Sequence, residues 1–118
     1  MIKEPLIEEH EKVWGSEFWL VNNDKYCAKY LVINSNAQGS LHYHPNKQET
    51  FIGVEGHAKL IIEGKTFIIF PGNHPKTILP YEKHQLIGLT DAVVLEVSTP
   101  HKETDVVRIT ESKANVPV

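Results

Sequence analysis

Short apolar or alternating segments, separated by turn residues, recur about every ten residues along the chain. Such runs, rich in β-branched and aromatic residues, are typical of an all-β sandwich or barrel. Only residues 3–12 favour a helical turn or two, because Pro5 is tolerated near the start of a helix. The pattern therefore predicts one all-β domain over residues 1–118, with residues 1–12 as an N-terminal extension. The expected strands are residues 17–21, 26–33, 41–44, 50–54, 58–62, 66–70, 77–79, 85–89, 92–97 and 106–109.

The charge balance argues against two classes of partner. Lys and Arg together number 12 and Asp and Glu 15, a net charge of −3, which gives no electrostatic footprint for nucleic acid or an anionic membrane. No apolar run approaches the roughly 18 residues of a membrane helix, and the acidic N-terminus lacks the apolar segment of a secretory signal. The single cysteine, Cys27, cannot form an internal disulfide. We therefore expect a cytoplasmic protein with neither nucleic-acid nor membrane partners.

Residues 36–56 (NAQGSLHYHPNKQETFIGVEG) carry the candidate chemistry. Strand side chains alternate between faces, so His42 and His44 project to the same side, about 7 Å apart. Glu49 follows after a connection long enough for a return strand, which would bring its carboxylate opposite the two imidazoles. Two nitrogens and one carboxylate oxygen suit a divalent first-row metal, with a fourth ligand from elsewhere in the sheet. A His-x-His pair alone is also typical of a solvent-exposed pair on an edge strand.

The spacing His42-x-His44-x4-Glu49-x6-Gly56 resembles the first conserved motif of the cupin superfamily. The interval before His42 begins with Asn36 where the family carries Gly, and Asn is the usual substitute where a turn needs positive φ. Within residues 72–88, the segment LPYEKH that ends at His84 resembles the second cupin motif. The resemblance implies a cupin-type double-stranded β-helix, which is a jelly-roll barrel. It also implies four metal ligands, namely His42, His44, Glu49 and His84.

Residues 13–109 resemble in particular the cupin module of type II mannose-6-phosphate isomerases. The resemblance rests on a Trp-Gly pair (residues 14–15), the histidine strand and an Asp-Val-Val-Arg segment (residues 105–108). In that group the strand carries Gln where this chain has His42. The resemblance implies a divalent transition metal (Zn, Mn, Fe or Ni) with one or two open positions, and aldose–ketose isomerisation of a sugar or sugar phosphate.

Such a reaction also needs a base. The ion would polarise the carbonyl and the adjacent hydroxyl, and the base would move a proton through an enediol. The candidate bases, by the same resemblance, are Lys47, Glu82 and Lys83. Lys47 stands where the isomerases carry an arginine, so holding a substrate carboxylate or phosphate is its alternative role.

The other notable side chains have structural interpretations. Tyr43 faces away from the ligands and is expected to pack against another element, and Cys27 is expected to be a small buried hydrophobe. Trp14 and Trp19 are expected in the core or at a subunit interface. The histidines outside the two motifs are expected in solvated turns or on the surface: His10, His57, His74 and His101. The side chains expected to fill the barrel interior are Phe51, Leu60, Phe67 and Ile69.

Two other functions fit the same residues. Histidines with a carboxylate also suit ferrous iron, so one alternative is a metal-dependent dioxygenase, which would consume O₂ with iron and be inactive with zinc. The other is a non-catalytic small-molecule-binding module, because a fold does not determine a function. Each alternative takes a small-molecule partner. Exposed edge strands on so short a barrel favour a homodimer, with the N-terminal strand as an exchange element.

Overall fold

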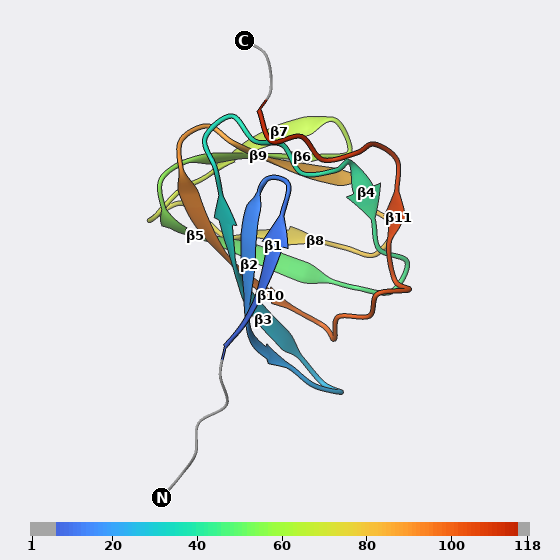
Figure 1. Ribbon diagram of the computed structural model, residues 1–118. Helices are drawn as coiled ribbons and strands as arrows, with labels where there is room; N and C mark the ends of the chain where they lie inside the picture. Colours follow the sequence, from blue (N-terminus) through green and yellow to red (C-terminus); the bar gives the residue numbers. More distant parts are fainter. Residues whose placement is uncertain (1–6, 116–118) are drawn as a thin grey trace, which may run out of the picture.

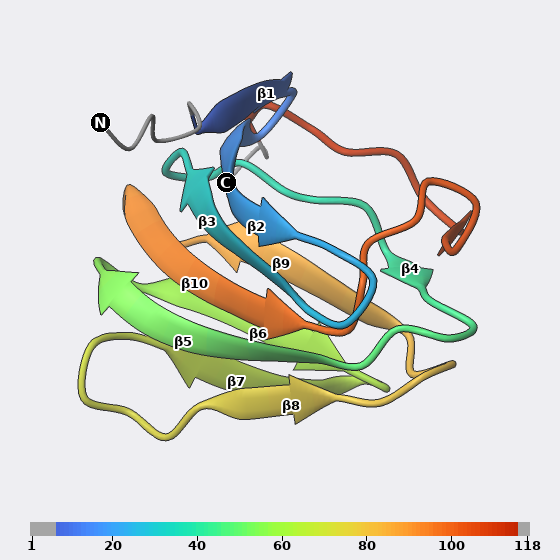
Figure 2. The ribbon, with the colours of Figure 1, turned by 90° about the horizontal axis from the view of Figure 1, so that it is seen from below.

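In the computed structural model, which describes residues 7–115, two antiparallel β-sheets pack face to face (Figures 1 and 2). The six-stranded sheet has the order β1-β2-β3-β10-β5-β8 and the five-stranded sheet the order β11-β4-β9-β6-β7. Strands distant in sequence, such as β3 and β10, are hydrogen-bonded neighbours, as in a jelly roll. The prediction of an all-β jelly roll is confirmed. The strands within the described residues are β1 (Glu8–Lys12), β2 (Gly15–Asn22), β3 (Cys27–Ile33), β4 (His42–Tyr43), β5 (Glu49–Glu55), β6 (Ala58–Ile62), β7 (Lys65–Ile69), β8 (Lys76–Ile78), β9 (His84–Gly88), β10 (Ala92–Ser98) and β11 (Val107–Arg108).

The N-terminal segment departs from the sequence-based expectation. Residues 8–12 do not form a helical turn but the edge strand β1, which pairs antiparallel with β2; residues 3–6 lie outside the described part of the chain. The strand is specified by tertiary pairing, since Trp19 on β2 stacks on His10 with ring centroids 4.3 Å apart. Its sequence, EEHEK, has no apolar alternation, so the usual strand signal is missing.

Alternating burial places the core between the sheets. In β3, residues 27, 29, 31 and 33 are buried and the intervening ones are more exposed, as expected for a strand with one face on a core. Leu60, Ile69 and Phe51 are buried as predicted, and Phe67 packs partly buried against them. Trp14 also packs against this cluster. The core residues are Leu31, Ile33, Ala37, Phe51, Ala58, Leu60, Ile62, Ile69, Ile78, Ala92 and Val94.

Two backbone positions fix the ends of the histidine segment. Asn36 has φ 64°, so the expectation that Asn replaces Gly at a left-handed turn is confirmed. Gly56 has φ 67°, and a Cβ added there would lie 2.1 Å from the carbonyl oxygen of Asp91. A side chain at position 56 would therefore displace the turn that leads into β6.

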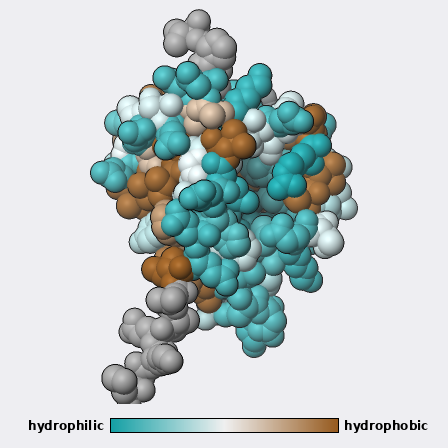
Figure 3. Space-filling model, viewed as in Figure 1, coloured by the Kyte–Doolittle hydropathy of each residue, from teal (hydrophilic) through white to brown (hydrophobic). Residues whose placement is uncertain are grey.

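The outer surface carries apolar side chains in separate places. On the face shown in Figure 3, hydrophobic patches are interspersed with a mostly hydrophilic surface. Apolar residues that are scattered singly are ordinary on a folded domain. Residues 7–115 contain no helix long and apolar enough to cross a membrane.

Candidate metal centre

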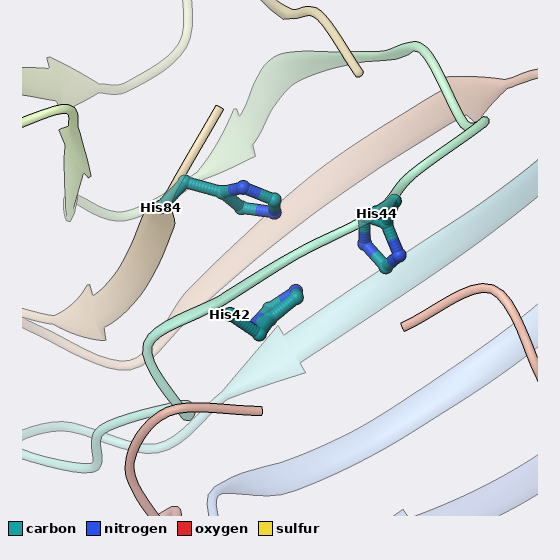
Figure 4. Close-up of side chains that lie close together, drawn as sticks. All are labelled: His42, His44 and His84. Atoms are coloured by element: carbon teal, nitrogen blue, oxygen red, sulfur yellow. The ribbon is translucent and has the colours of Figure 1, made fainter. Parts of the chain in front are cut away.

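Three histidines, two on strands of the five-stranded sheet and one directly after β4, meet at one end of the space between the sheets. His42 on β4 lies directly across from His84 on β9, and His44 follows two residues after His42. One ring nitrogen from each lies within 4.8 Å of the others, and Figure 4 shows the three rings turned toward a common space. His42 is half-buried and His44 is buried, so the His-x-His segment is not a solvent-exposed pair on an edge. The three imidazoles could hold a metal ion.

Backbone carbonyls fix the orientation and tautomer of all three rings. The acceptors are the carbonyl oxygens of Ser40 for His42 (2.8 Å), Asp105 for His44 (2.7 Å) and Glu82 for His84 (2.9 Å), each bonded to Nδ1. A carbonyl only accepts, so each Nδ1 carries a proton, and Nε2 is the ring nitrogen left to bind an ion. Metal-ligating histidines use this arrangement, with the distal ring nitrogen held by an acceptor.

A buried carboxylate lies beside the Nε2 atoms of two of these rings. Glu49, 3% exposed at the start of β5, has Oε2 3.1 Å from His44 Nε2 and Oε1 3.8 Å from His84 Nε2. Glu49 Oε2 and His84 Nε2 are both buried without a hydrogen-bond partner among the described residues. Unpaired buried polar atoms are costly, and a cation between them would satisfy both. The residues present therefore fit a divalent transition metal.

The electrostatics give this donor set the protonation states that a cation requires. Burial, with a contribution from His84, lowers the pKa of His42 to about 3. Burial also lowers the pKa of His84. For Glu49, burial opposes ionisation, but the neighbouring His44 and Lys47 hold its pKa below the ordinary value. Near neutral pH the imidazoles at 42 and 84 are therefore neutral, and the carboxylate is charged.

The metal-free protein should lose stability as the pH falls through the interval from about 6.5, the ordinary pKa of histidine, to about 3. In this interval the unfolded chain binds a proton at His42 that the folded chain does not bind, so acid favours unfolding. Thermal unfolding of chelator-treated protein between about pH 7.5 and 5 should show a falling Tm. The Tm of a His42→Gln variant should depend less on pH. An unchanged Tm in the parent over that range would contradict the lowered pKa of His42.

Lys47 is buried and protonated rather than free to accept a proton. Its Nζ lies 2.7 Å from Glu96 Oε2 and 4.0 Å from Glu49 Oε2. Burial alone would lower the pKa of Lys47, but Glu96 and Glu49 raise it above its usual range. The geometry favours a role for Lys47 in holding the two carboxylates rather than as a base.

Two other base candidates lie away from the centre. The Glu82 carboxylate accepts a hydrogen bond from the backbone N–H of Leu79 (2.7 Å), closing the turn before β9. Lys83 is exposed, and its backbone N–H donates to the side chain of Glu63. Neither side chain lines the cavity that the histidines border, so the structure does not bring Glu82 or Lys83 to the candidate site.

The cavity has a second polar wall that the sequence interpretation missed. It has a volume of about 270 Å³, and Lys29 on β3, 2% exposed, lines it. Lys29 Nζ lies 4.2 Å from the Trp19 ring centroid, 3.6 Å from Glu17 Oε1 and 3.0 Å from His101 Nδ1. Alternation could have found Lys29, because it shares the inward face of β3 with Leu31.

His101 was expected on the surface, and the structure corrects this. Its ring lines the cavity, and its Nε2 lies 3.0 Å from the exposed carboxylate of Glu103. Burial and the charge of Lys29 lower the pKa of His101. His101 reaches the cavity because the loop after β10 folds back onto β2, where the ring centroids of His101 and Trp19 lie 4.8 Å apart.

The remaining aromatic residues lie outside the centre. Tyr43 packs against Tyr81 with ring centroids 6.0 Å apart and does not line the cavity, as predicted. His57 is exposed and stacks on Phe70, and His74 is exposed. Cys27 is a buried free thiol, and burial raises its pKa, which agrees with a packing role.

No protein-family model and no curated protein sequence matches this chain. Solved structures do match. An RmlC-like cupin from Shewanella frigidimarina has a TM-score of 0.72 and 20% identity, over 83% of this chain and 87% of that one. KdgF from Halomonas sp. has a TM-score of 0.74 and 16% identity, over 82% and 89%. CapF, a capsular polysaccharide assembling protein from Staphylococcus aureus, has a TM-score of 0.76 and 14% identity, over 96% of this chain and 35% of that one. The likeness shows that the chain has the cupin fold.

Proposed function

We propose that the protein is a metal-dependent aldose–ketose isomerase of a sugar or sugar phosphate. The ion is a divalent transition metal held by His42, His44, His84 and Glu49. The observation that carries the proposal is the set of three imidazoles whose Nδ1 atoms are bound to carbonyls and whose other ring nitrogens converge beside a buried carboxylate. The sequence resemblance to mannose-6-phosphate isomerases supports the choice of reaction.

The donor set leaves room for substrate. Four protein ligands on a first-row ion that accepts five or six leave one or two positions open, which distinguishes catalytic from structural sites. When bound, the ion would act as a Lewis acid that makes the hydrogen beside a carbonyl more acidic. Leu31, Phe51 and Leu86 form an apolar part of the cavity wall, which limits the water that surrounds a bound sugar.

The proton acceptor must be a titratable side chain that lines the cavity. Lys47 keeps its proton, so the candidates become Glu96 and His101. Glu96 Oε2 lies 2.7 Å from the ammonium of Lys47, which keeps this carboxylate charged beside the cavity that it lines. His101 is neutral near pH 7, because its pKa is lowered. A carboxylate or a neutral imidazole can each accept a carbon-bound proton.

Hydrogen–deuterium exchange at C2 of a sugar tests the proposal directly. The purified protein is stripped with a chelator, reloaded separately with Zn, Mn, Fe and Ni, and mixed with free and phosphorylated aldoses in D₂O for NMR. We expect no C2 exchange without metal and restored exchange with at least one ion. Loss of exchange in Glu96→Gln but not in His101→Gln, or the reverse, identifies the base.

A complete absence of C2 exchange over that panel would contradict the isomerase. Oxygen uptake with iron alone would then indicate the dioxygenase, whereas ligand-induced stabilisation without turnover would indicate a binding module. The homodimer and cytoplasmic location expected from the sequence remain parts of the proposal. Sedimentation velocity tests the first, and a monomer at micromolar concentration would refute it.

A further inference from the structure

The charged side chains around the cavity differ in whether they are paired. Lys29 lies 3.6 Å from Glu17, and Lys47 lies 2.7 Å from Glu96, so each buried lysine has a carboxylate partner. Arg108, the only arginine of the chain, lines the same cavity. Within residues 7–115 its guanidinium makes no ion pair and no side-chain hydrogen bond. Arg108 is therefore free to bind a ligand that enters the cavity.

The sheet register places Arg108 next to the metal centre. Arg108 on β11 is the direct partner of His42 on β4, and the two strands lie side by side at the edge of the five-stranded sheet (Figure 1). Directly opposed residues of an antiparallel pair project to the same face, with Cα atoms about 4.5–5.5 Å apart. Arg108 is exposed, so it borders the cavity from the solvent side.

The charge of the cavity favours an anionic ligand. The charged side chains that line it are four basic residues, Lys12, Lys29, Lys47 and Arg108, and four acidic residues, Glu17, Glu49, Glu96 and Glu103. These charges balance, so a divalent cation leaves an excess of two positive charges. Like Arg108, Lys12 makes no ion pair within residues 7–115, and it borders the cavity from β1 on the other sheet. An anion would reduce this excess.

We propose that Arg108 binds an anionic group of the substrate, a phosphate or a carboxylate, and thereby selects phosphorylated sugars or sugar acids over neutral sugars. The planar guanidinium forms paired hydrogen bonds with either group. The cavity of about 270 Å³ is at the small end of ligand pockets, so one small molecule would extend from the metal centre to Arg108. The identity of the substrate rests on the proposed function, whereas the anion site does not.

Calorimetric titration tests the anion site without requiring turnover. Inorganic phosphate, mannose 6-phosphate, glucuronate and mannose are titrated into the metal-loaded protein and its Arg108→Gln variant. We expect the variant to bind the charged probes about 10- to 100-fold more weakly, the range expected for loss of a hydrogen-bonded charge. Neutral mannose should bind the two proteins equally. The phosphate and carboxylate probes distinguish the two anion classes.

Three comparisons make the result decisive. Lys65→Gln removes one positive charge at an exposed position that begins β7, away from the cavity, and should bind all probes as the parent does. Arg108→Lys keeps the positive charge but cannot form the paired hydrogen bonds of the guanidinium, so it should restore binding in part. Metal content and Tm of each variant confirm that the centre and fold persist. Equal binding of phosphate and glucuronate by the parent and Arg108→Gln would overturn the proposal.

The anion site and the isomerase can fail separately. Arg108-dependent anion binding without C2 exchange would retain the site and remove the isomerase. The second outcome is C2 exchange that discriminates between charged and neutral sugars equally well in the parent and in Arg108→Gln, as measured by the ratio of their kcat/KM values. That result would retain the isomerase and remove this role of Arg108.

Discussion

Replacement of His84 by alanine is expected to lower metal affinity by about 100-fold or more and to abolish any metal-dependent activity. His84 is 2% exposed, and its Nε2 has no hydrogen-bond partner within the described chain and lies within reach of the other two imidazoles, so it is placed to bind an ion. Loss of a residue that only orients a ligand typically costs about 10- to 100-fold in metal affinity, and loss of the ligand itself should cost more. Metal content after dialysis against a competing chelator measures the effect.

The matched control for this experiment is His57→Ala. His57 is exposed and stacks on Phe70 away from the cavity, so its loss should leave the metal content unchanged. Circular dichroism of both variants establishes that each remains folded. Full metal retention by folded His84→Ala protein would refute the assignment of His84 as a ligand.

Replacement of Lys47 by methionine is expected to destabilise the metal-free protein by about 3–5 kcal/mol, the usual cost of removing one partner of a buried ion pair. The ammonium lies 2.7 Å from Glu96 and 4.0 Å from Glu49, so its loss leaves two buried carboxylates without their cation. Urea denaturation measures the change in the free energy of unfolding.

A second substitution separates the loss of charge from the loss of packing. The double variant Lys47→Met/Glu96→Leu removes both charges of the closer pair and should regain much of the lost stability. Exposed Lys83→Met should change the free energy of unfolding by no more than about 0.5 kcal/mol. A Lys47→Met protein as stable as the parent would show that the buried pair does not contribute to stability.

Most strands and the pair His42 and His44 could be predicted from the sequence because their signals are local, whereas His84 was expected only from the resemblance to cupins. Period-two alternation marks a strand such as β3, and the His-x-His spacing alone puts His42 and His44 on one face. β1 could not be found in this way, since its charged residues become a strand only by pairing with β2. Its formation depends on a contact that the segment itself does not encode.

The rest of the cavity depends on contacts between distant segments. His101 lies over Trp19 because the loop after β10 folds back onto β2, and no local pattern specifies that path. Arg108 meets His42 through the pairing of β11 with β4, two strands of two residues each. Glu82 lies away from the cavity because its side chain closes its own turn, a local geometry that the looser second motif did not reveal.

The three carbonyl-bound imidazoles also bear on which ion the protein carries. The bonds that orient the rings are intramolecular, so the ligands are already arranged before an ion arrives. A preorganised nitrogen-rich site follows the Irving–Williams series, in which copper and zinc bind more tightly than manganese or iron. Metallation should then depend on which ions are available during synthesis, and protein purified from a different host should carry a different metal.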